Sequence, residues 1–133
     1  MKNRKRKDSE PPFVTAKLGW RYHHLGIPTA TAHPGEVLIP GLGIRVSGFE
    51  SSPFGIQWMR FENETQPAAV RSIPHVAFEV DDLEHALREC GAEVLTPPNS
   101  PSPGVRVAMI LHDGAPIELI EFRRGQRKKK SMS

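Results

Sequence analysis

Residues 73–78 read IPHVAF, and this strand-like stretch has an earlier counterpart, YHHLGI, at residues 22–27. When His75 is aligned with His24, a second pair of segments also corresponds: IQWMRF at 56–61 matches IELIEF at 117–122. Each half of the chain therefore opens with a strand that carries a histidine. Each half closes with a strand that carries Gln57 or Glu118 at the matched place. This internal repeat indicates a duplicated structural unit.

The second copy shows its secondary structure more clearly than the first. Residues 72–80 are mostly apolar and β-branched or aromatic, as is typical of a buried strand. Asp81 and Glu84 have the spacing of a capping box, apolar residues recur at helical spacing up to Cys90, and Gly91 stands where the helix would end. Further strands are expected at 93–95, 105–111 and 116–122, with a proline-rich loop over 97–104. The order predicted for this copy is β-α-β-β-β.

The first copy is a shortened version of that unit. Strands are expected at 20–27, 44–49 and 56–61, but residues 29–35 contain a Pro-Gly pair and no apolar stripe. The spacing agrees with a lost helix, since 33 positions separate His24 from Gln57 whereas 43 separate His75 from Glu118. The expected fold class is α+β, with two tandem βαβββ units of which the first nearly lacks its helix.

Length and charge indicate one domain between two basic ends. At 133 residues the chain lies within the single-domain range. The domain is expected over 19–123, with unit 1 at about 19–65 and unit 2 at about 72–123. Eleven of the eighteen basic residues lie in 2–7 and 123–130. We therefore expect a basic, disordered N-terminal tail over 1–18 and a basic C-terminal tail over 124–133.

Several protein classes are disfavoured by the same composition. The chain has no apolar run near the ~20 residues that a membrane helix needs, and no hydrophobic stretch follows its basic start as in a secretory signal. The single cysteine, Cys90, excludes an intrachain disulfide and favours a cytoplasmic protein, in which it would be buried. Between 11 and 122 the body has thirteen acidic and seven basic residues, and no nucleic-acid-binding signature accompanies the basic ends. We expect neither a membrane nor a nucleic acid as partner.

The duplicated unit and its motifs resemble the vicinal oxygen chelate superfamily, which includes glyoxalase I, methylmalonyl-CoA epimerase, extradiol dioxygenases and bleomycin-resistance proteins. The resemblance covers roughly residues 19–123 and is most specific in PHVAFEVDDL at 74–83 and PIELIEF at 116–122. It implies that the two units form a cup-shaped, half-open barrel. It also implies one divalent metal ion per chain, held by the first and last strands of each unit.

Carried over to this sequence, the family's metal ligands are His24, Gln57, His75 and Glu118, a combination most similar to that of methylmalonyl-CoA epimerase. Two imidazoles, an amide oxygen and a carboxylate suit a first-row divalent ion, here Zn, Ni, Co, Mn or Fe. Period-two alternation would place all four side chains on the concave face. The resemblance implies a small substrate with two adjacent oxygens, whose enolate the metal stabilises during proton transfer. Glu118 or a nearby carboxylate would be the catalytic base.

Other roles for individual residues stay open. Gln57 also fits an ordinary hydrogen-bonding role, and His23 is expected on the face opposite His24. Arg45, Arg60 and Arg71 are candidates to receive an anionic group of a substrate. PGLG at 40–43 reads as a turn rather than a phosphate-binding loop, so no nucleotide cofactor site is expected.

Two other functions also stay open. One is a non-catalytic drug-binding protein of the bleomycin-resistance kind, which would sequester an aromatic ligand in an apolar cleft. The other is an Fe(II) extradiol-type dioxygenase, which binds iron through two histidines and a glutamate without the glutamine. Many proteins of the superfamily are dimers, and a half-open sheet has edges to cover, so a homodimer is expected.

Overall fold

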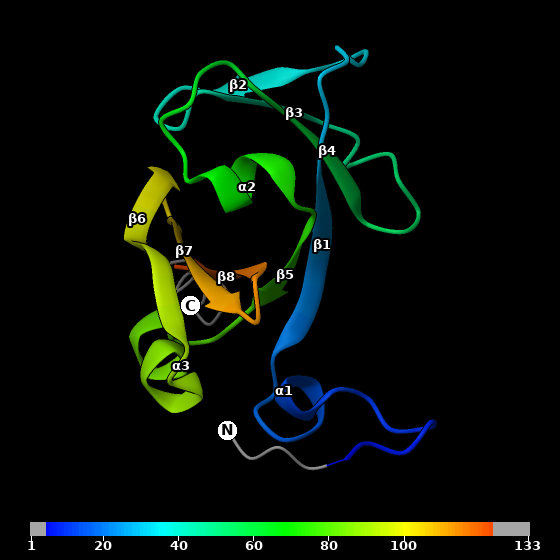
Figure 1. Cartoon of the computed structure of the whole chain (residues 1–133), viewed down its shortest axis with the longest axis vertical. Coiled ribbons are helices and arrows are strands. Elements are labelled where there is room, and N and C mark those ends of the chain that lie inside the picture. Colours follow the sequence, from blue (N-terminus) through cyan, green and yellow to red (C-terminus); the bar gives the residue numbers. More distant parts are fainter. Residues whose placement is uncertain (1–4, 124–133) are drawn as a thin grey trace, which may run out of the picture.

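Eight strands form a single curled sheet in the computed structural model, which describes residues 5–123 (Figure 1). The strand order across the sheet is β2-β3-β4-β1-β5-β8-β7-β6. The strands are β1 (Arg21–Pro28), β2 (Val37–Ile39), β3 (Ile44–Ser47), β4 (Ile56–Phe61), β5 (His75–Glu79), β6 (Glu93–Ser102), β7 (Val105–His112) and β8 (Ala115–Phe122). The helices are α1 (Phe13–Ala16), α2 (Ala68–Ser72) and α3 (Leu83–Cys90). The predicted α+β, cup-shaped fold is confirmed.

The two halves of the sheet have the same strand order when the strands are counted outward from the centre. The order is β1-β4-β3-β2 in unit 1 and β5-β8-β7-β6 in unit 2, so the two halves mirror each other. In unit 1 the first strand pairs in parallel with the last, β1 with β4, and in unit 2 β5 pairs in parallel with β8. Gln57 lies beside Gly26, two residues after His24, and Glu118 lies beside Ala77, two residues after His75. The sequence repeat is thus reproduced in the register of the strands.

The two units join through an antiparallel pair formed by β1 and β5 at the centre of the sheet. His24 lies opposite Ala77, and Gly26 lies opposite His75. Because residues that face each other across a ladder project to the same side, both histidines project to one face. The junction of the two units is therefore also the place where their histidines meet.

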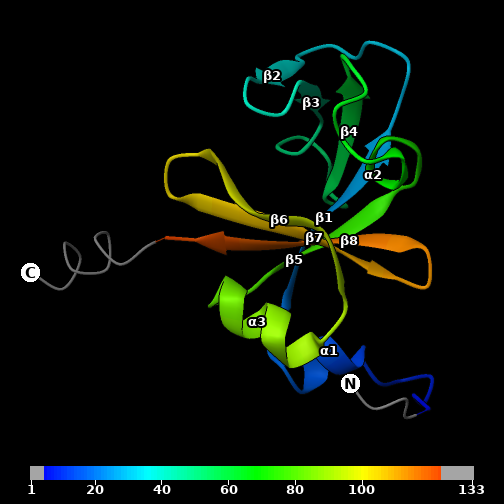
Figure 2. The ribbon, with the colours of Figure 1, turned by 60° about the vertical axis from the view of Figure 1, so that its left-hand side comes forward.

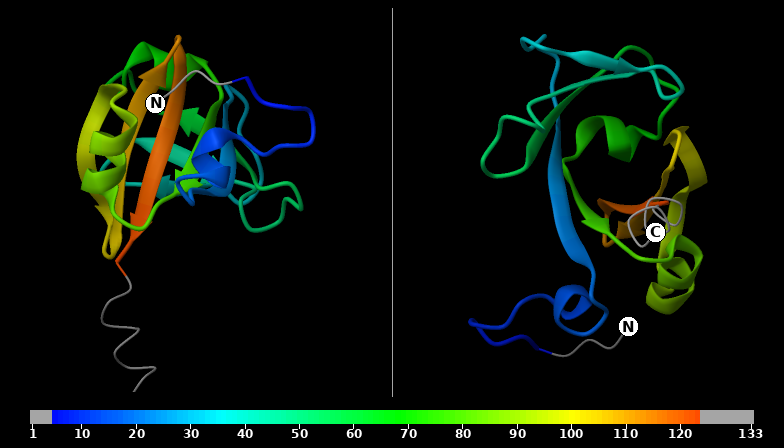
Figure 3. Two further views of the ribbon diagram at one scale, coloured as in Figure 1. Left: turned by 90° about the horizontal axis from the view of Figure 1, so that it is seen from below. Right: turned by 180° about the vertical axis from the view of Figure 1, so that it is seen from behind.

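Helix α3 covers the convex face of unit 2 and forms the main hydrophobic core with it (Figure 3). Leu83 is fully buried, and its neighbours Ala86 and Cys90 face β7 and β8, so the prediction of a buried thiol is confirmed. The helix ends at Gly91, whose φ of 62° is the left-handed conformation expected there. At the other end the N-cap is Asp82, which accepts from the backbone N–H of His85 at 3.0 Å. The capping residue therefore lies one position after the Asp81 expected from sequence.

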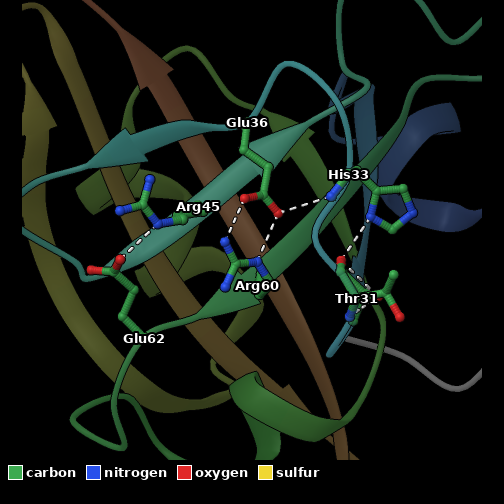
Figure 4. A network of polar contacts seen from close by, with 7 residues as sticks. Thr31, His33, Glu36, Arg45, Arg60 and Glu62 are labelled. Carbon is green, nitrogen blue, oxygen red and sulfur yellow. Dashed lines mark hydrogen bonds and ion pairs between the residues drawn. The ribbon is translucent and has the colours of Figure 1, made fainter.

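Unit 1 has no helix between β1 and β2, as its shortened sequence predicts. A loop with polar contacts covers this part of its convex face instead (Figure 4). The ring of His33 stacks on Trp58 with centroids 5.0 Å apart, and Glu36 accepts two hydrogen bonds from Arg60 at 2.6 and 2.8 Å. Arg45 donates to Glu62 at 2.6 Å nearby. This face of unit 1 is therefore held by charge pairs and one ring stack rather than by an apolar helix.

Two segments differ from the expectations stated above. Helix α1 and the following turn belong to the ordered chain, and Val14 and Leu18, placed in the N-terminal tail from sequence, pack against the core. Helices α1 and α3 lie at the same end of the molecule, opposite β2 and β3 (Figure 2). The proline-rich segment expected as a loop over 97–104 is extended up to Ser102 as part of β6. Strand β6 is an edge strand with repeated register shifts. Prolines, which have no backbone N–H, are tolerated there because many positions of such a strand need no donor to a neighbouring strand.

The expected C-terminal tail over 124–133 lies outside the described residues. Within residues 5–123, no helix is long and apolar enough to span a membrane.

Candidate metal centre

Two small residues at the centre of the sheet leave room for three larger polar ones. Along one row of the ladder, His24, Ala77 and Glu118 are neighbours, and in the adjacent row Gln57, Gly26 and His75 are neighbours. A Cβ atom at Gly26 would lie only 2.3 Å from the His75 ring. The imidazole of His75 therefore occupies the space that a side chain at position 26 would fill.

Three of the four predicted ligands converge on the concave face. The Nε2 atom of His75 lies 2.9 Å from Oε1 of Glu118, and Nε2 of His24 lies 3.5 Å from the same oxygen. The two imidazole centroids are 5.6 Å apart. One donor atom from each of the three residues lies within 4.8 Å of the others. These side chains are 43 to 94 positions apart in sequence. The pairing of the two repeated units brings them together.

The donor set fits a divalent ion on two observations. His24 and His75 are 4% and 1% exposed, yet Nε2 of His24 and Nδ1 of His75 have no hydrogen-bond partner within residues 5–123. Buried polar atoms normally have a partner, and an ion would supply one to the Nε2 of His24. Nitrogen donors from two imidazoles and one carboxylate oxygen are also the ligand types that first-row divalent metals prefer.

The carboxyl of Glu118 is ionised in this surrounding. Burial raises its pKa, but the rings of His24 and His75, whose Nε2 atoms lie 3.5 and 2.9 Å from the carboxylate, outweigh that effect and lower the pKa to about 2. A carboxylate rather than a carboxylic acid therefore faces the two imidazoles, which is the form that binds metals. The same stabilisation makes Glu118 a weak base as long as both imidazoles hold it.

Gln57 lies on the same face and lines the same cavity as His24 and Glu118. Its neighbour in the ladder, Gly26, separates it from His75. The structure therefore places the fourth predicted ligand at the edge of the cluster.

His23 is a residue of this site that the sequence prediction placed on the opposite face. A register shift in the pairing of β1 with β5 lies between Tyr22 and His24. It lets the His23 ring line the same cavity as His24, with the two Nδ1 atoms 2.8 Å apart. A β-bulge of this kind breaks the period-two alternation on which the prediction rested. No signal in the sequence marks it.

His24, Glu118 and Gln57 open onto a cavity of about 310 Å³ between the two units, whereas His75 lies buried beside Glu118, outside the lining. Apart from these residues, His23 and Ser102, its walls are apolar and come from both halves of the sheet: Ile39, Leu42, Ile44, Val46, Phe49, Met59, Pro101, Val105, Val107, Ile120 and Phe122. Within residues 5–123, no lysine or arginine lines it, and Glu118 is its one carboxylate. The predicted site thus combines a buried polar floor with an apolar enclosure.

The three arginines considered for an anionic group lie elsewhere. Arg45 and Arg60 project from the convex face of unit 1, where they pair with Glu62 and Glu36 (Figure 4). Arg71 donates to the backbone carbonyl of Gln66 and lines a separate, open hollow. None of them lies in the lining of the metal-site cavity.

This chain is similar to several solved structures. Methylmalonyl-CoA epimerase from Mycobacterium tuberculosis is 22% identical, with a TM-score of 0.52 over 81% of this chain and 91% of that chain. A glyoxalase family protein from Enterococcus faecalis is 20% identical, with a TM-score of 0.34 over 82% and 83% of the two chains. A glyoxalase/bleomycin resistance protein/dioxygenase from Nocardioides is 19% identical, with a TM-score of 0.32 over 85% and 74%.

The comparison with the epimerase shows that this chain and that protein share a fold. At this level of identity the likeness concerns the fold alone. No protein-family model matches the sequence, and no curated protein matches it at a significant level.

Proposed function

We propose that this protein is a metal-dependent enzyme of the glyoxalase or epimerase kind, which moves a proton beside a carbonyl of a small substrate with two adjacent oxygens. The observation that carries the proposal is the buried cluster of His24, His75 and Glu118, two of which, His24 and Glu118, line an apolar cavity. These three residues and the amide oxygen of Gln57 would hold one divalent ion. Such an ion supplies Lewis acidity toward oxygens of a bound substrate.

Glu118 is the residue we assign to the proton transfer as well. It is the one carboxylate in the lining of the cavity among residues 5–123. Because His24 and His75 together keep its pKa near 2, it gains basicity only when its contacts with these rings loosen. We therefore assign the base role to a state in which the carboxylate turns away from His75 toward the substrate.

The lining of the cavity also supports a substrate class. An apolar wall without a cationic side chain within residues 5–123 does not compensate a second anionic group, and burying an unpaired charge is costly. The substrate is therefore an apolar molecule whose polar groups are confined to the two chelating oxygens. A coenzyme A thioester or a dicarboxylate is disfavoured.

The metal content tests the proposal directly. Protein purified without chelator and incubated with Zn, Ni, Co, Mn or Fe(II) should contain close to one ion per chain by elemental analysis. His75→Ala should lose most of that occupancy, because the remaining ligands cannot close around the gap. Gln57→Ala should lose much less, since water can replace a neutral amide. Absence of metal from the wild type in every incubation would reject the enzyme proposal and favour the drug-sequestering alternative.

A pair of matched chelators tests the substrate class in the metal-loaded protein. 4-Methylcatechol and 3,4-dihydroxybenzoate share the ring and the adjacent hydroxyls and differ by a methyl or a carboxylate. We expect the methyl compound to bind more tightly in calorimetric titrations, because the cavity cannot pair the second charge. Equal or tighter binding of the benzoate would refute the apolar substrate class and leave the metal site standing.

A second candidate function follows from the three-residue cluster itself. The cluster of two histidines and one glutamate also matches the facial triad of Fe(II) oxygenases, in which Gln57 would not be a ligand. Oxygen uptake with catechols in the Fe(II)-loaded protein, unchanged by Gln57→Ala, would support that function over proton transfer.

A further inference from the structure

We infer that His23 is a positioning residue for the metal site: its Nδ1 accepts a hydrogen bond from Nδ1–H of His24 and so keeps Nε2 of His24 unprotonated for an ion. This inference rests on the proposed function, because it concerns the metal-bound state. It adds a residue that the superfamily's ligand set does not contain.

The β-bulge in β1 is what brings His23 into the site. Tyr22 lies opposite Phe78 and His24 lies opposite Ala77, so β1 advances by two residues where β5 advances by one, and His23 is the additional residue of the bulge. In a regular strand, neighbouring side chains project to opposite faces, and His23 would lie on the convex side. The extra residue re-aims its ring into the cavity beside His24.

Two aromatic rings hold His23 in that place. Its imidazole stacks on Phe49, with centroids 5.0 Å apart and planes 23° from parallel. On another side it contacts Phe122 at a centroid distance of 5.4 Å. Phe49 follows β3 and Phe122 ends β8, so the ring is fixed by both units of the fold. Its Nδ1 atom is 2.8 Å from Nδ1 of His24.

The proton between the two Nδ1 atoms can then be assigned. A metal-bound nitrogen carries no proton, and Nε2 is the nitrogen of His24 that faces Glu118. A neutral His24 with an ion on Nε2 must carry its proton on Nδ1, and that N–H donates to the Nδ1 of His23. Outer partners of this kind, usually a carboxylate or a backbone carbonyl, orient ligating imidazoles and raise their basicity. In this protein the imidazole of His23 would be that outer partner of His24.

The other histidine of the cluster lacks such a partner. Nδ1 of His75 is buried and has no hydrogen-bond acceptor within residues 5–123. Its ring is oriented by packing over Gly26 instead. Of the two histidines, only His24 is therefore oriented by a hydrogen bond at its Nδ1 atom within residues 5–123, and His23 is its partner.

Two variants separate the hydrogen bond from the ring packing. His23→Phe keeps a ring between Phe49 and Phe122 but has no acceptor, whereas His23→Asn loses the ring and places an oxygen near the former Nδ1. Zn²⁺ affinity is measured by competition with a chelator, after thermal melting has shown that each variant folds. We expect His23→Phe to bind Zn²⁺ about 10- to 100-fold more weakly and His23→Asn to stay within a few-fold of the wild type.

The second readout is the tautomer of His24. In the ¹⁵N NMR spectrum of the Zn²⁺-loaded wild type, Nδ1 of His24 should be protonated and hydrogen-bonded, a signature that His23→Asn preserves and His23→Phe loses. Unchanged affinity in His23→Phe, or equal losses in both variants, would overturn the inference while the metal site stands. A wild type that takes up no Zn²⁺ would overturn the proposed function itself, which is a distinguishable result.

Discussion

At the scale of single residues, the site depends on small residues in the sheet as much as on the polar side chains that converge there. Gly26 and Ala77 occupy the two central positions where larger side chains would fill the floor of the cup. Ala77 is fully buried beside Glu118, and the space above Gly26 belongs to the ring of His75. The convergence of the polar residues is therefore possible because their neighbours in the sheet are small.

This arrangement predicts the effect of one added methyl group. In Gly26→Ala, the new Cβ would lie 2.3 to 2.8 Å from three atoms of the His75 ring, so the imidazole must move. We expect Zn²⁺ affinity to fall on the order of 10-fold or more and stability to fall by about 1–3 kcal/mol. Gly41→Ala is the matched control, because a Cβ there meets nothing within 4 Å. Wild-type metal affinity in Gly26→Ala would show that the His75 position described above is wrong.

At the scale of elements, the convex face of unit 1 has a loop where unit 2 has a helix. The hydrogen bonds from Arg60 are the main reason that the pKa of Glu36 is lowered from 4.5 to about 2, against a smaller opposing effect of burial. A carboxyl whose pKa is depressed in the folded state stabilises the fold above its unfolded pKa. That contribution is lost as the pH falls from 4.5 toward 2.

Glu36→Gln should therefore be destabilising near neutral pH and much less so in acid. The measurement is the free energy of unfolding in urea for both proteins without metal, at about pH 6 and at about pH 3. The gap between wild type and variant should narrow at the lower pH. Glu50→Gln, on an exposed loop, serves as the control substitution. A gap that stays constant with pH would mean that the Glu36–Arg60 pair does not stabilise the fold.

The same scale shows which features a sequence can and cannot predict. The repeat, the helix before Gly91 and the missing helix of unit 1 follow from patterns of several residues that act together. The bulge at His23 adds a single residue to β1, and the period-two pattern carries no mark of it. The proline-rich part of β6 reads as a loop because its edge position, which makes prolines tolerable, is a property of the whole sheet. The regular alternation of side chains along the strands could therefore be predicted from the sequence, whereas the irregular position of His23 could not.

At the scale of the whole molecule, two edge strands of the curled sheet are open to pairing with another chain. Strand β2 ends one side and β6 ends the other, and Val37 on β2 and Val94 on β6 are 63% and 47% exposed. Exposed edges with apolar side chains are normally covered in stable proteins. We therefore propose a homodimer, for which size-exclusion chromatography with light scattering should give twice the mass of 14.8 kDa. A monomeric mass at micromolar concentration would reject it.

The mirrored strand order has a consequence for how the protein opens and closes. Each unit supplies two of the four proposed ligands, so an ion could be retained only while both units are native at once. Unit 1, with no helix between β1 and β2, is the half expected to open first by local fluctuation, and without metal it could do so independently. A bound ion at 100 times its dissociation constant would add about 2.7 kcal/mol to the opening of either half. Metal binding would thus make the two units open together as a single cooperative unit. The relative gain in the free energy of opening would be greater for unit 1, which is the less stable half without metal.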